Sequence, residues 1–415
     1  MLLDVGVDKL VDRFTRIRSH TESICANLAP EDYVVQPTED VSPPKWHLAH
    51  TTWFFETFLL KEYDKSYQEF DPSFSYLFNS YYVSAGERWV RAKRGNLSRP
   101  TVARLYDYRA YVDQAMKHLL GSGELTDRLL YILEMGLNHE QQHQELLYYD
   151  IKYILGHNPI LPKYAEGNVV EGKLIDQQWL NIEEGVYEIG HAGQGFCYDN
   201  ELGHHKVYLM KYVISNRLVT NEEYRAFILD GGYSDASLWL SEGWDWVEEH
   251  GVRNPLYWHQ KGDQFFEYNL TGVAGLALNA PVANISFYEA DAFARWSGKR
   301  LPTEFEWEVA CKLYAKTNGQ ELFSDRNAFQ PCETGSVDFL GNLWEWTSSP
   351  YRPYPYYKVE HSALGEYNGK FMINQMVLRG GSYATSRDHI RSTYRNFFHP
   401  HLRWMFSGIR LADHC

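Results

Sequence analysis

The amino-acid sequence predicts a two-domain protein in which a helical bundle precedes an irregular α+β domain. Its 415 residues are too many for one ordinary hydrophobic core and suit two. Only seven of the 30 glycines lie in residues 1–156, so the character of the chain changes near Gly156. Long stretches with helical periodicity precede that point, and short segments rich in Trp, Tyr and Gly follow it.

Four segments of the first part have helical character. The N-terminal one places apolar residues three and four positions apart among charges, and a second surrounds residues 46–61. Thr101 and Thr126 are expected to cap a third and a fourth, because a threonine hydroxyl accepts a free backbone N–H of the first turn. Gly156 ends the fourth. These segments predict a four-helix bundle over residues 1–156.

The second part of the chain has weaker patterns. Residues 157–175 carry prolines and polar residues and are expected to form a linker. Residues 176–415 show no strong period, and Ser286–Ser297 is the clearest helix candidate among them. A loop-rich α+β domain is therefore expected there.

Composition and charge exclude several classes of function. A formal net charge of −14 argues against nucleic acid or an anionic membrane as a partner, so small-molecule substrates are expected. No apolar run is long enough to span a bilayer, and the N-terminus does not have the pattern of a signal peptide. Five scattered cysteines, none in CxxC spacing, argue against a zinc–cysteine site and against a disulfide framework. A cytoplasmic protein is expected.

The most informative residues are histidines. His139 and His143 lie four apart on an expected helix, so one helix face can present two imidazoles to a metal, and Gln142 borders that face. His47 or His50, near the start of another expected helix, could reach across the bundle as a third ligand. Three histidines leave coordination positions open, which suits Fe(II) that must accept a thiol substrate and O2.

These residues leave alternatives open. Histidines at this spacing also occur without any metal. The HEQQH segment satisfies the HExxH pattern of zinc metalloproteases, in which Glu140 would be the general base of a zinc hydrolase. A non-enzymatic binding protein that uses the second domain is a further alternative.

Seven segments spread over nearly the whole chain resemble one enzyme family. They are PPKWHLAHTTWFFE, FNSYYVSAGERW, RGNLSRPTV, LNHEQQHQELL, GNLWEWTSSP, RGGSYATSRDHIRSTYRNFF and FSGIRLA. This order resembles the ergothioneine-biosynthesis sulfoxide synthases, in which a DinB-like four-helix bundle precedes a formylglycine-generating-enzyme-like (C-type-lectin-like) domain that completes the substrate pocket. The resemblance implies an Fe(II)- and O2-dependent oxidoreductase that joins the sulfur of cysteine or γ-glutamylcysteine to C2 of hercynine, the Nα-trimethyl derivative of histidine.

The resemblance also implies a metal site. By the match, iron is held by His50, His139 and His143, and His47 lies outside the ligand set. All three implied ligands belong to the expected helical bundle.

Two further pairs of residues match family positions. Tyr81 and Tyr82 match a branch that places adjacent tyrosines at the site, where a phenol can supply a proton during oxygen activation and steer the oxidised sulfur toward carbon. Arg91 and Arg94 match the pair that holds the carboxylate of the thiol, since a guanidinium pairs with a carboxylate through parallel hydrogen bonds.

The acceptor is expected to meet residues from both parts of the chain. Gln142 would hydrogen-bond its imidazole, whereas Asn396, Phe397 and Phe398 would lie near its carboxylate and its trimethylammonium group, which aromatic faces bind well. Some relatives carry Trp-Asp in place of Phe397-Phe398 and use the acid to hold the amine of γ-glutamylcysteine. The absence of that acid favours free cysteine.

Departures from the family of the second domain limit its chemistry. No cysteine lies between Cys332 and Cys415, so the copper-dependent oxidation of formylglycine-generating enzymes is not expected, and Arg379–Ser382 is expected to be a scaffold turn. Within the expected chemistry, a selenoneine-type synthase with a selenium donor and an ovothiol-type synthase remain alternatives. Ovothiol synthases usually carry an added methyltransferase domain, which we do not expect here.

Overall fold

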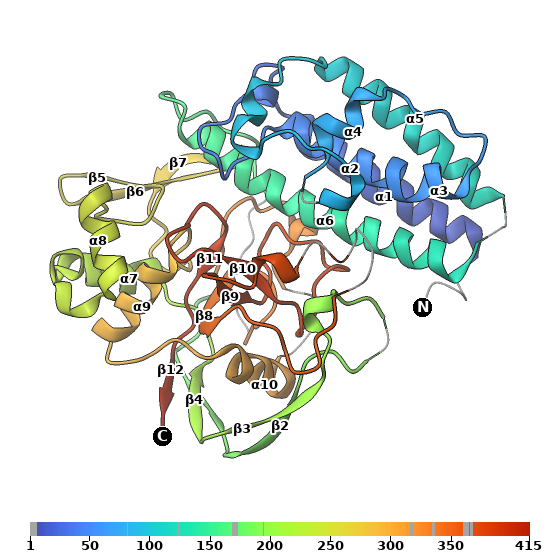
Figure 1. Ribbon diagram of the computed structural model, residues 1–415. Coiled ribbons are helices and arrows are strands. Elements are labelled where there is room, and N and C mark those ends of the chain that lie inside the picture. The colour runs from blue at the N-terminus through green and yellow to red at the C-terminus, as the bar shows by residue number, and fades with distance from the viewer. Residues whose placement is uncertain are drawn as a thin grey trace. The chain divides into compact units, whose positions relative to one another are not determined.

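The computed structural model describes residues 6–80, 82–122, 125–167, 173–193, 195–315, 319, 321–333, 337–359, 365 and 368–415. The chain forms two compact units (Figure 1). The first comprises the chain up to Ile160 with two short later stretches, and the second comprises the remainder from Leu161 onward. The finer boundaries at residues 156 and 175 stay predictions.

The first unit is a four-helix bundle, as predicted. Its long helices are α1 (Val7–Cys25), α2 (Pro44–Phe55), α5 (Val102–Gly121) and α6 (Asp127–Gly156). In Figure 1 they lie side by side, with α1 and α2 each packed against both α5 and α6. The short α3 (Lys61–Tyr63) and α4 (Ser73–Phe78) complete the unit.

The predicted capping residues explain where two of these helices begin. The Thr101 hydroxyl accepts the backbone N–H of Arg104, and the Thr126 hydroxyl accepts that of Leu129. Each satisfies a donor that has no partner within the helix. The helices bury their apolar faces in one core, to which Phe14 of α1 also contributes.

The helix α2 lies in the centre of the bundle. All twelve of its residues are buried, so polar side chains on it must find partners inside the protein. Where one continuous helix was expected around 46–61, α2 ends at Phe55 and a π-helical turn follows at Glu56–Leu60. The buried Glu56 carboxylate accepts hydrogen bonds from the hydroxyls of Tyr67 and Tyr108 at this turn.

The helices α2 and α6 approach closely at a glycine. A Cβ atom on Gly136 would lie 2.8 Å from a ring carbon of Phe55 and 2.9 Å from one of Phe54. Any larger residue would therefore push the two helices apart.

Among its described residues, the second unit contains four small sheets and four α-helices. Its strands are β1 (Trp179–Ile182), β2 (Gly185–Ile189), β3 (His205–Leu209), β4 (Tyr212–Ser215), β5 (Trp258–Lys261), β6 (Gln264–Asn269), β7 (Gly272–Gly275), β8 (Trp344–Pro350), β9 (Met376–Arg379), β10 (Asn396–Phe398), β11 (Ser407–Gly408) and β12 (Ala412–His414). The sheets have the orders β1-β4-β12, β2-β3, β5-β6-β7 and β10-β9-β8-β11. Within the described strands, β11 and β8 are parallel, and the remaining pairs are antiparallel.

The helices of the second unit are more numerous than the sequence pattern indicated. The predicted helix at Ser286–Ser297 is α9 (Phe287–Trp296), and α7 (Asn221–Leu229), α8 (Ser241–His250) and α10 (Glu304–Tyr314) accompany it. Helices α7, α9 and α10 each begin with a capping box, in which a Ser or Thr and a Glu three residues later satisfy each other's backbone N–H groups. These boxes are visible in the sequence and could have revealed α7 and α10.

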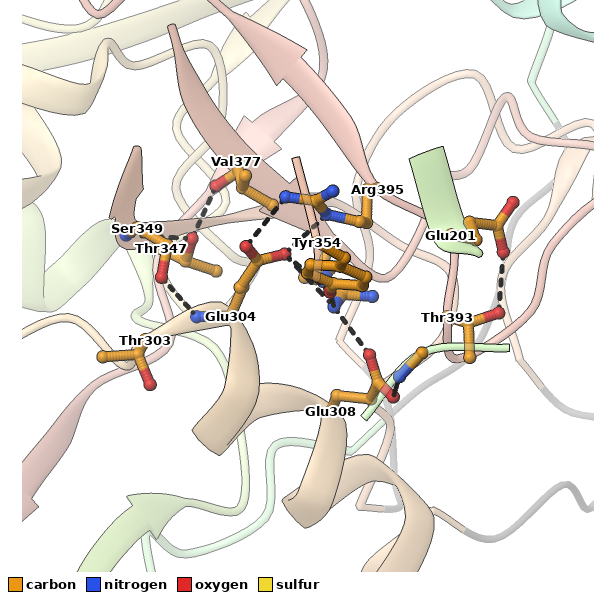
Figure 2. A network of polar contacts seen from close by, with 12 residues as sticks. Glu201, Thr303, Glu304, Glu308, Thr347, Ser349, Tyr354, Val377, Thr393 and Arg395 are labelled. Atoms are coloured by element: carbon orange, nitrogen blue, oxygen red, sulfur yellow. Dashed lines mark hydrogen bonds and ion pairs between the residues drawn. The ribbon is translucent and has the colours of Figure 1, made fainter. Parts of the chain in front are cut away.

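A buried ionic network holds the centre of the second unit (Figure 2). Glu304 accepts hydrogen bonds from the guanidinium of Arg395 at 2.8 and 3.0 Å and from the hydroxyl of Tyr354 at 3.1 Å. Arg379 pairs with Glu308 at 2.7 Å and with Glu304 at 3.3 Å. Since all four charged side chains are buried, the network compensates charges that would be costly alone.

The turn after Arg379 needs its glycines. Gly380 and Gly381 have φ of 105° and 82°, and a Cβ on Gly380 would lie 2.7 Å from the carbonyl oxygen of Phe339. This geometry agrees with the expected scaffold role of Arg379–Ser382.

Across the described ranges, none of the helices combines the length with the apolar character that crossing a bilayer requires.

Candidate metal centre

Two helices of the bundle bring three histidines together. The rings of His139 and His143, one turn apart on α6, have centroids 4.6 Å apart. His50 on α2 faces both, with centroid distances of 5.1 Å to His139 and 4.8 Å to His143. One ring nitrogen from each of the three lies within 4.8 Å of the others. These are the histidines that the resemblance implied as ligands.

The burial of the three imidazoles keeps them neutral. All are at most 6% exposed. Burial and the neighbouring histidines hold the pKa of His50 and of His143 well below the usual range. Burial lowers the pKa of His139 to about 4. Neutral imidazoles keep a lone pair for a metal, so the group is ready to bind one near neutral pH.

The orientation of His50 is set by the backbone and by a neighbouring ring. Its Nδ1 lies 2.6 Å from the carbonyl oxygen of Phe78, which can only accept, so Nδ1 carries the proton. The Nε2 atom is then the nitrogen with a lone pair. Trp46, one turn earlier on α2, stacks on the His50 ring with centroids 4.5 Å apart.

His47 lies beside the three histidines, with both ring nitrogens engaged. Its Nδ1 is 2.8 Å from Nδ1 of His143, and its Nε2 is 2.9 Å from the carboxylate of Asp150. Both nitrogens therefore face side chains other than those of His50 and His139.

The geometry opposes the zinc-hydrolase alternative. The carboxylate of Glu140 is fully buried and paired with Arg18 at 2.9 Å and with Arg109 at 2.5 Å. It also accepts the hydroxyl of Thr21. Burial alone would raise the pKa of Glu140, but the two arginines lower it to about 2. A carboxylate held in two buried ion pairs cannot act as a general base for water.

Tyr82 packs behind the histidine group, whereas Tyr81 lies outside the described residues. The buried ring of Tyr82 has its centroid 5.6 Å from that of Trp53 and 6.4 Å from that of Phe54. Trp53 stacks on His50, and Phe54 contacts His139. Tyr82 is thus placed next to the rings that flank two of the three histidines.

Arg94 and Arg91 lie on the segment that follows Tyr82. Arg94 is buried and donates to the hydroxyls of Ser42 at 2.8 Å and Ser80 at 3.0 Å, with its guanidinium carbon 3.2 Å from the centroid of Trp46. Arg91 donates to the backbone carbonyl of residue 40 at 2.8 Å. Through Trp46, Arg94 belongs to the same stack as His50.

Gln142 is partly buried on α6, between the two histidines of that helix. Its position in the sequence therefore keeps it at the border of the face that carries His139 and His143.

The remaining predicted residues form β10 of the second unit. Phe397 stacks on Tyr351 at 4.0 Å, and Phe398 lies 5.2 Å from Trp404. Because successive side chains of a strand alternate, Asn396 and Phe398 share one face and Phe397 points to the other. Arg395, just before the strand, anchors it through the Glu304 network.

Comparisons with known proteins agree with both units. Residues 13–147 match the model of the DinB superfamily, and residues 171–322 and 313–415 match that of the sulfatase-modifying factor enzyme 1-like domain. The hercynine oxygenase of Mycolicibacterium thermoresistibile is 30% identical over 90% of this chain and 87% of its own length. That of Mycobacterium tuberculosis is 30% identical over 90% of this chain and 91% of its own.

The chain belongs to the hercynine oxygenase family. It is accordingly an enzyme of the oxygenase type. A formylglycine-generating enzyme from Streptomyces coelicolor is 26% identical over 49% of this chain and 78% of its own length.

The donor set suits a metal-dependent oxygenase. Three neutral imidazoles from two helices match the ligands that zinc, iron and other first-row metals prefer, and three ligands leave positions open for substrates. His50, His139 and His143 would hold the ion.

Two residues beside this group were not predicted from the sequence. Trp46 and Asp150 each touch the histidines or their neighbours, yet neither belongs to a metal motif. Asp150 follows His143 by seven residues, which is two helical turns on the same face. An acid in the mostly apolar end of α6, which otherwise carries only Lys152 as a charged residue, was the available signal.

Proposed function

We propose that this chain catalyses the Fe(II)- and O2-dependent formation of a bond between a thiol sulfur and C2 of hercynine, which gives a sulfoxide in ergothioneine biosynthesis. The observation that carries the proposal is the buried group of His50, His139 and His143, which offers three neutral nitrogen donors. Its membership of the hercynine oxygenase family supports hercynine as the acceptor.

The proposed reaction balances without an external reductant. Joining an S–H and a C2–H into a C–S bond releases two electrons, and oxidation of the sulfur to a sulfoxide releases two more. O2 takes all four, leaving one oxygen atom in the sulfoxide and the other in water. The water contains the two hydrogens of the S–H and C2–H bonds.

The choice of metal follows from this balance. Zinc would bind the same imidazoles but has no redox chemistry. A ferrous ion held there would supply the one-electron chemistry that lets O2 react with a thiol. The contribution of the chain is to present Nε2 of His50 beside the rings of His139 and His143, in a bundle core that excludes water.

We propose that Arg91 and Arg94 bind the carboxylate of the thiol. Arg94 now donates to two neutral hydroxyls, Ser42 and Ser80. Hydrogen bonds to a carboxylate are roughly twice as strong as those to neutral acceptors, so a substrate carboxylate competes well for this guanidinium. Tyr81 or Tyr82 would donate a proton from its phenolic oxygen while the sulfur is oxidised.

The other roles are proposed from the family match. Gln142 would hydrogen-bond the hercynine imidazole, and Asn396, Phe397 and Phe398 would bind its carboxylate and its trimethylammonium group. The alternation of side chains along β10 favours a division of these roles, with Asn396 and Phe398 acting together.

Cysteine is the proposed sulfur donor. An ammonium buried against Phe397 and Phe398 without an acid is costly, so kcat/KM should be much higher for cysteine than for γ-glutamylcysteine. Comparable specificity constants for the two thiols would contradict this choice. A selenium donor in place of the thiol would be recognised by the mass of its product.

We propose that the two parts of the chain have different tasks. Residues 1–156 carry the iron ligands, 157–175 form a linker, and 176–415 carry the acceptor-binding residues.

All five cysteines are free, which supports a reducing, cytoplasmic setting.

The decisive experiment uses anaerobically purified protein loaded with Fe(II). Hercynine, cysteine and O2 should give the sulfoxide by mass spectrometry, whereas zinc-loaded protein should give none. Ala at His50, His139 or His143 should abolish both iron binding and product. Sulfoxide formation by a variant that holds no iron would refute the proposed centre.

A further inference from the structure

The hydrogen bonds of His47 fix where its proton lies. The Asp150 carboxylate can only accept, so Nε2 of His47 donates to it across 2.9 Å. A neutral His47 then has a lone pair on Nδ1. That nitrogen faces Nδ1 of His143 at 2.8 Å, a hydrogen-bond distance that requires one donor and one acceptor.

The tautomer of His47 determines the tautomer of His143. Since Nδ1 of His47 accepts, Nδ1 of His143 must donate and carries the proton of that ring. The lone pair of His143 is then on Nε2. His50 also has its lone pair on Nε2, because its Nδ1 donates to the carbonyl oxygen of Phe78.

We propose that Asp150 and His47 form a positioning pair that fixes the tautomer and the ring orientation of His143 for metal binding. The inference rests on the proposed function, because it takes His143 to be a metal ligand. Metal-binding histidines commonly donate their second nitrogen to a carboxylate, and here His47 extends that link by one ring. Both members of the pair are buried, so water does not compete for their hydrogen bonds.

A third contact makes the pair testable. The oxygen of Asp150 that accepts from His47 also accepts the backbone N–H of Ser42 at 2.9 Å. In Asp150→Asn, this fixed donor keeps an amide oxygen at that place, and the oxygen still accepts from His47. The Asn variant therefore loses the charge but retains the direction of these two hydrogen bonds, whereas Asp150→Ala removes both of them.

His47 offers a similar comparison. His47→Asn places an amide oxygen near the position of Nδ1, where it can accept from His143. His47→Phe keeps a ring of similar shape but has no acceptor.

The experiment measures the Kd of full-length protein for Fe(II), and for Co(II) by its visible absorption, under anaerobic conditions. We expect Asp150→Ala and His47→Phe to bind roughly 10–100-fold more weakly than the wild type. Asp150→Asn should remain within a few-fold of it, and His47→Asn should lie between. The Co(II) spectrum should broaden in the Ala and Phe variants, because the His143 ring is no longer fixed.

Glu56→Gln is the matched control. Glu56 is a buried carboxylate of the same bundle that accepts from Tyr67 and Tyr108, away from the histidine group. The Glu56→Gln substitution should lower the melting temperature of the apoprotein and leave the Kd for the metal unchanged. An equal loss of affinity in Glu56→Gln and Asp150→Ala would overturn the proposal, as would a wild-type Kd in Asp150→Ala. A wild-type protein that binds neither metal would instead refute the proposed function.

Discussion

At the scale of single residues, we propose that Tyr81 or Tyr82 decides which product forms. Oxidation of the thiol to a sulfinic acid is chemically easier than C–S bonding and requires no second substrate to react. An early proton from a phenol opposes it. Tyr82 lies against Trp53 and Phe54, so loss of its hydroxyl alone leaves the packing of its ring intact.

We therefore predict that either Tyr81→Phe or Tyr82→Phe still consumes O2 but shifts the product from sulfoxide toward cysteine sulfinate, whereas the other changes it less. Product ratios by mass spectrometry, with iron content as the control, check this expectation. An unaltered ratio in the double variant would place the proton source elsewhere, with the Tyr351–Tyr357 segment as the next candidate.

The cysteines give a second prediction at this scale. Burial raises the pKa of Cys25 and of Cys311 to about 12, and the thiolate is the reactive form. Cys415 is exposed. Iodoacetamide at pH 8 should modify Cys415 first and leave Cys25 and Cys311 unmodified in the native protein, as followed by peptide mass spectrometry. In guanidinium chloride all five should react. Equal native rates at Cys25 and Cys415 would contradict the burial of Cys25.

At the scale of elements, the separation of α2 and α6 determines whether three rings can share one ion. His50 belongs to α2, and His139 and His143 belong to α6. Gly136 lies one turn before His139, where the rings of Phe54 and Phe55 fill the space that a side chain would need. The geometry of the site thus depends on a residue that touches no ligand.

We predict that Gly136→Ala destabilises the protein by about 1–3 kcal/mol through overpacking and weakens Fe(II) binding at the same time. Urea unfolding and metal titration measure the two effects. Gly121→Ala is a control, since a Cβ at the end of α5 meets nothing within 4 Å. Gly136→Ala with unchanged metal affinity would show that the bundle can absorb the methyl group without moving α2 from α6.

At the scale of the whole molecule, the two units are stabilised in different ways. The bundle relies on an apolar core around α2, although Arg18, Arg109 and Glu140 are also buried there. The second unit has short strands and buries Arg379 and Arg395 with their acids. Removing one member of such a network leaves a buried charge with too few partners.

We predict that Arg395→Met lowers the free energy of unfolding by about 3–5 kcal/mol, because the buried Glu304 carboxylate loses its bidentate hydrogen bonds with Arg395. Iron content per folded chain should not change, since all candidate ligands belong to the first unit. Denaturant unfolding with parallel iron analysis is the measurement. Arg253→Met, which breaks an ion pair with Glu248 that is exposed on both sides, should cost only about 0–1 kcal/mol. Equal losses in the two variants would contradict the importance of burial.

Local signals in the sequence were sufficient for the bundle and for the two histidines on one helix. Thr101 and Thr126 cap α5 and α6 as predicted, because capping and helical periodicity depend on neighbours within a few residues. The same reasoning applied to the capping boxes at Thr220 and Thr303 would have found α7 and α10. The fold class and the family resemblance were likewise predictable from the order of motifs.

Only the tertiary structure decided how these parts act on one another. Spacing alone left both His47 and His50 open as the third histidine, since both lie on α2 one turn apart. Packing against α6 places the His50 ring beside that of His139 and brings His47 within hydrogen-bond distance of Asp150. Glu140 matched a general base in the motif, but Arg18 and Arg109, from two other helices, convert it into a structural anion. Such roles depend on which distant side chains surround a group, and that is determined by helix packing, which no local pattern in the sequence encodes.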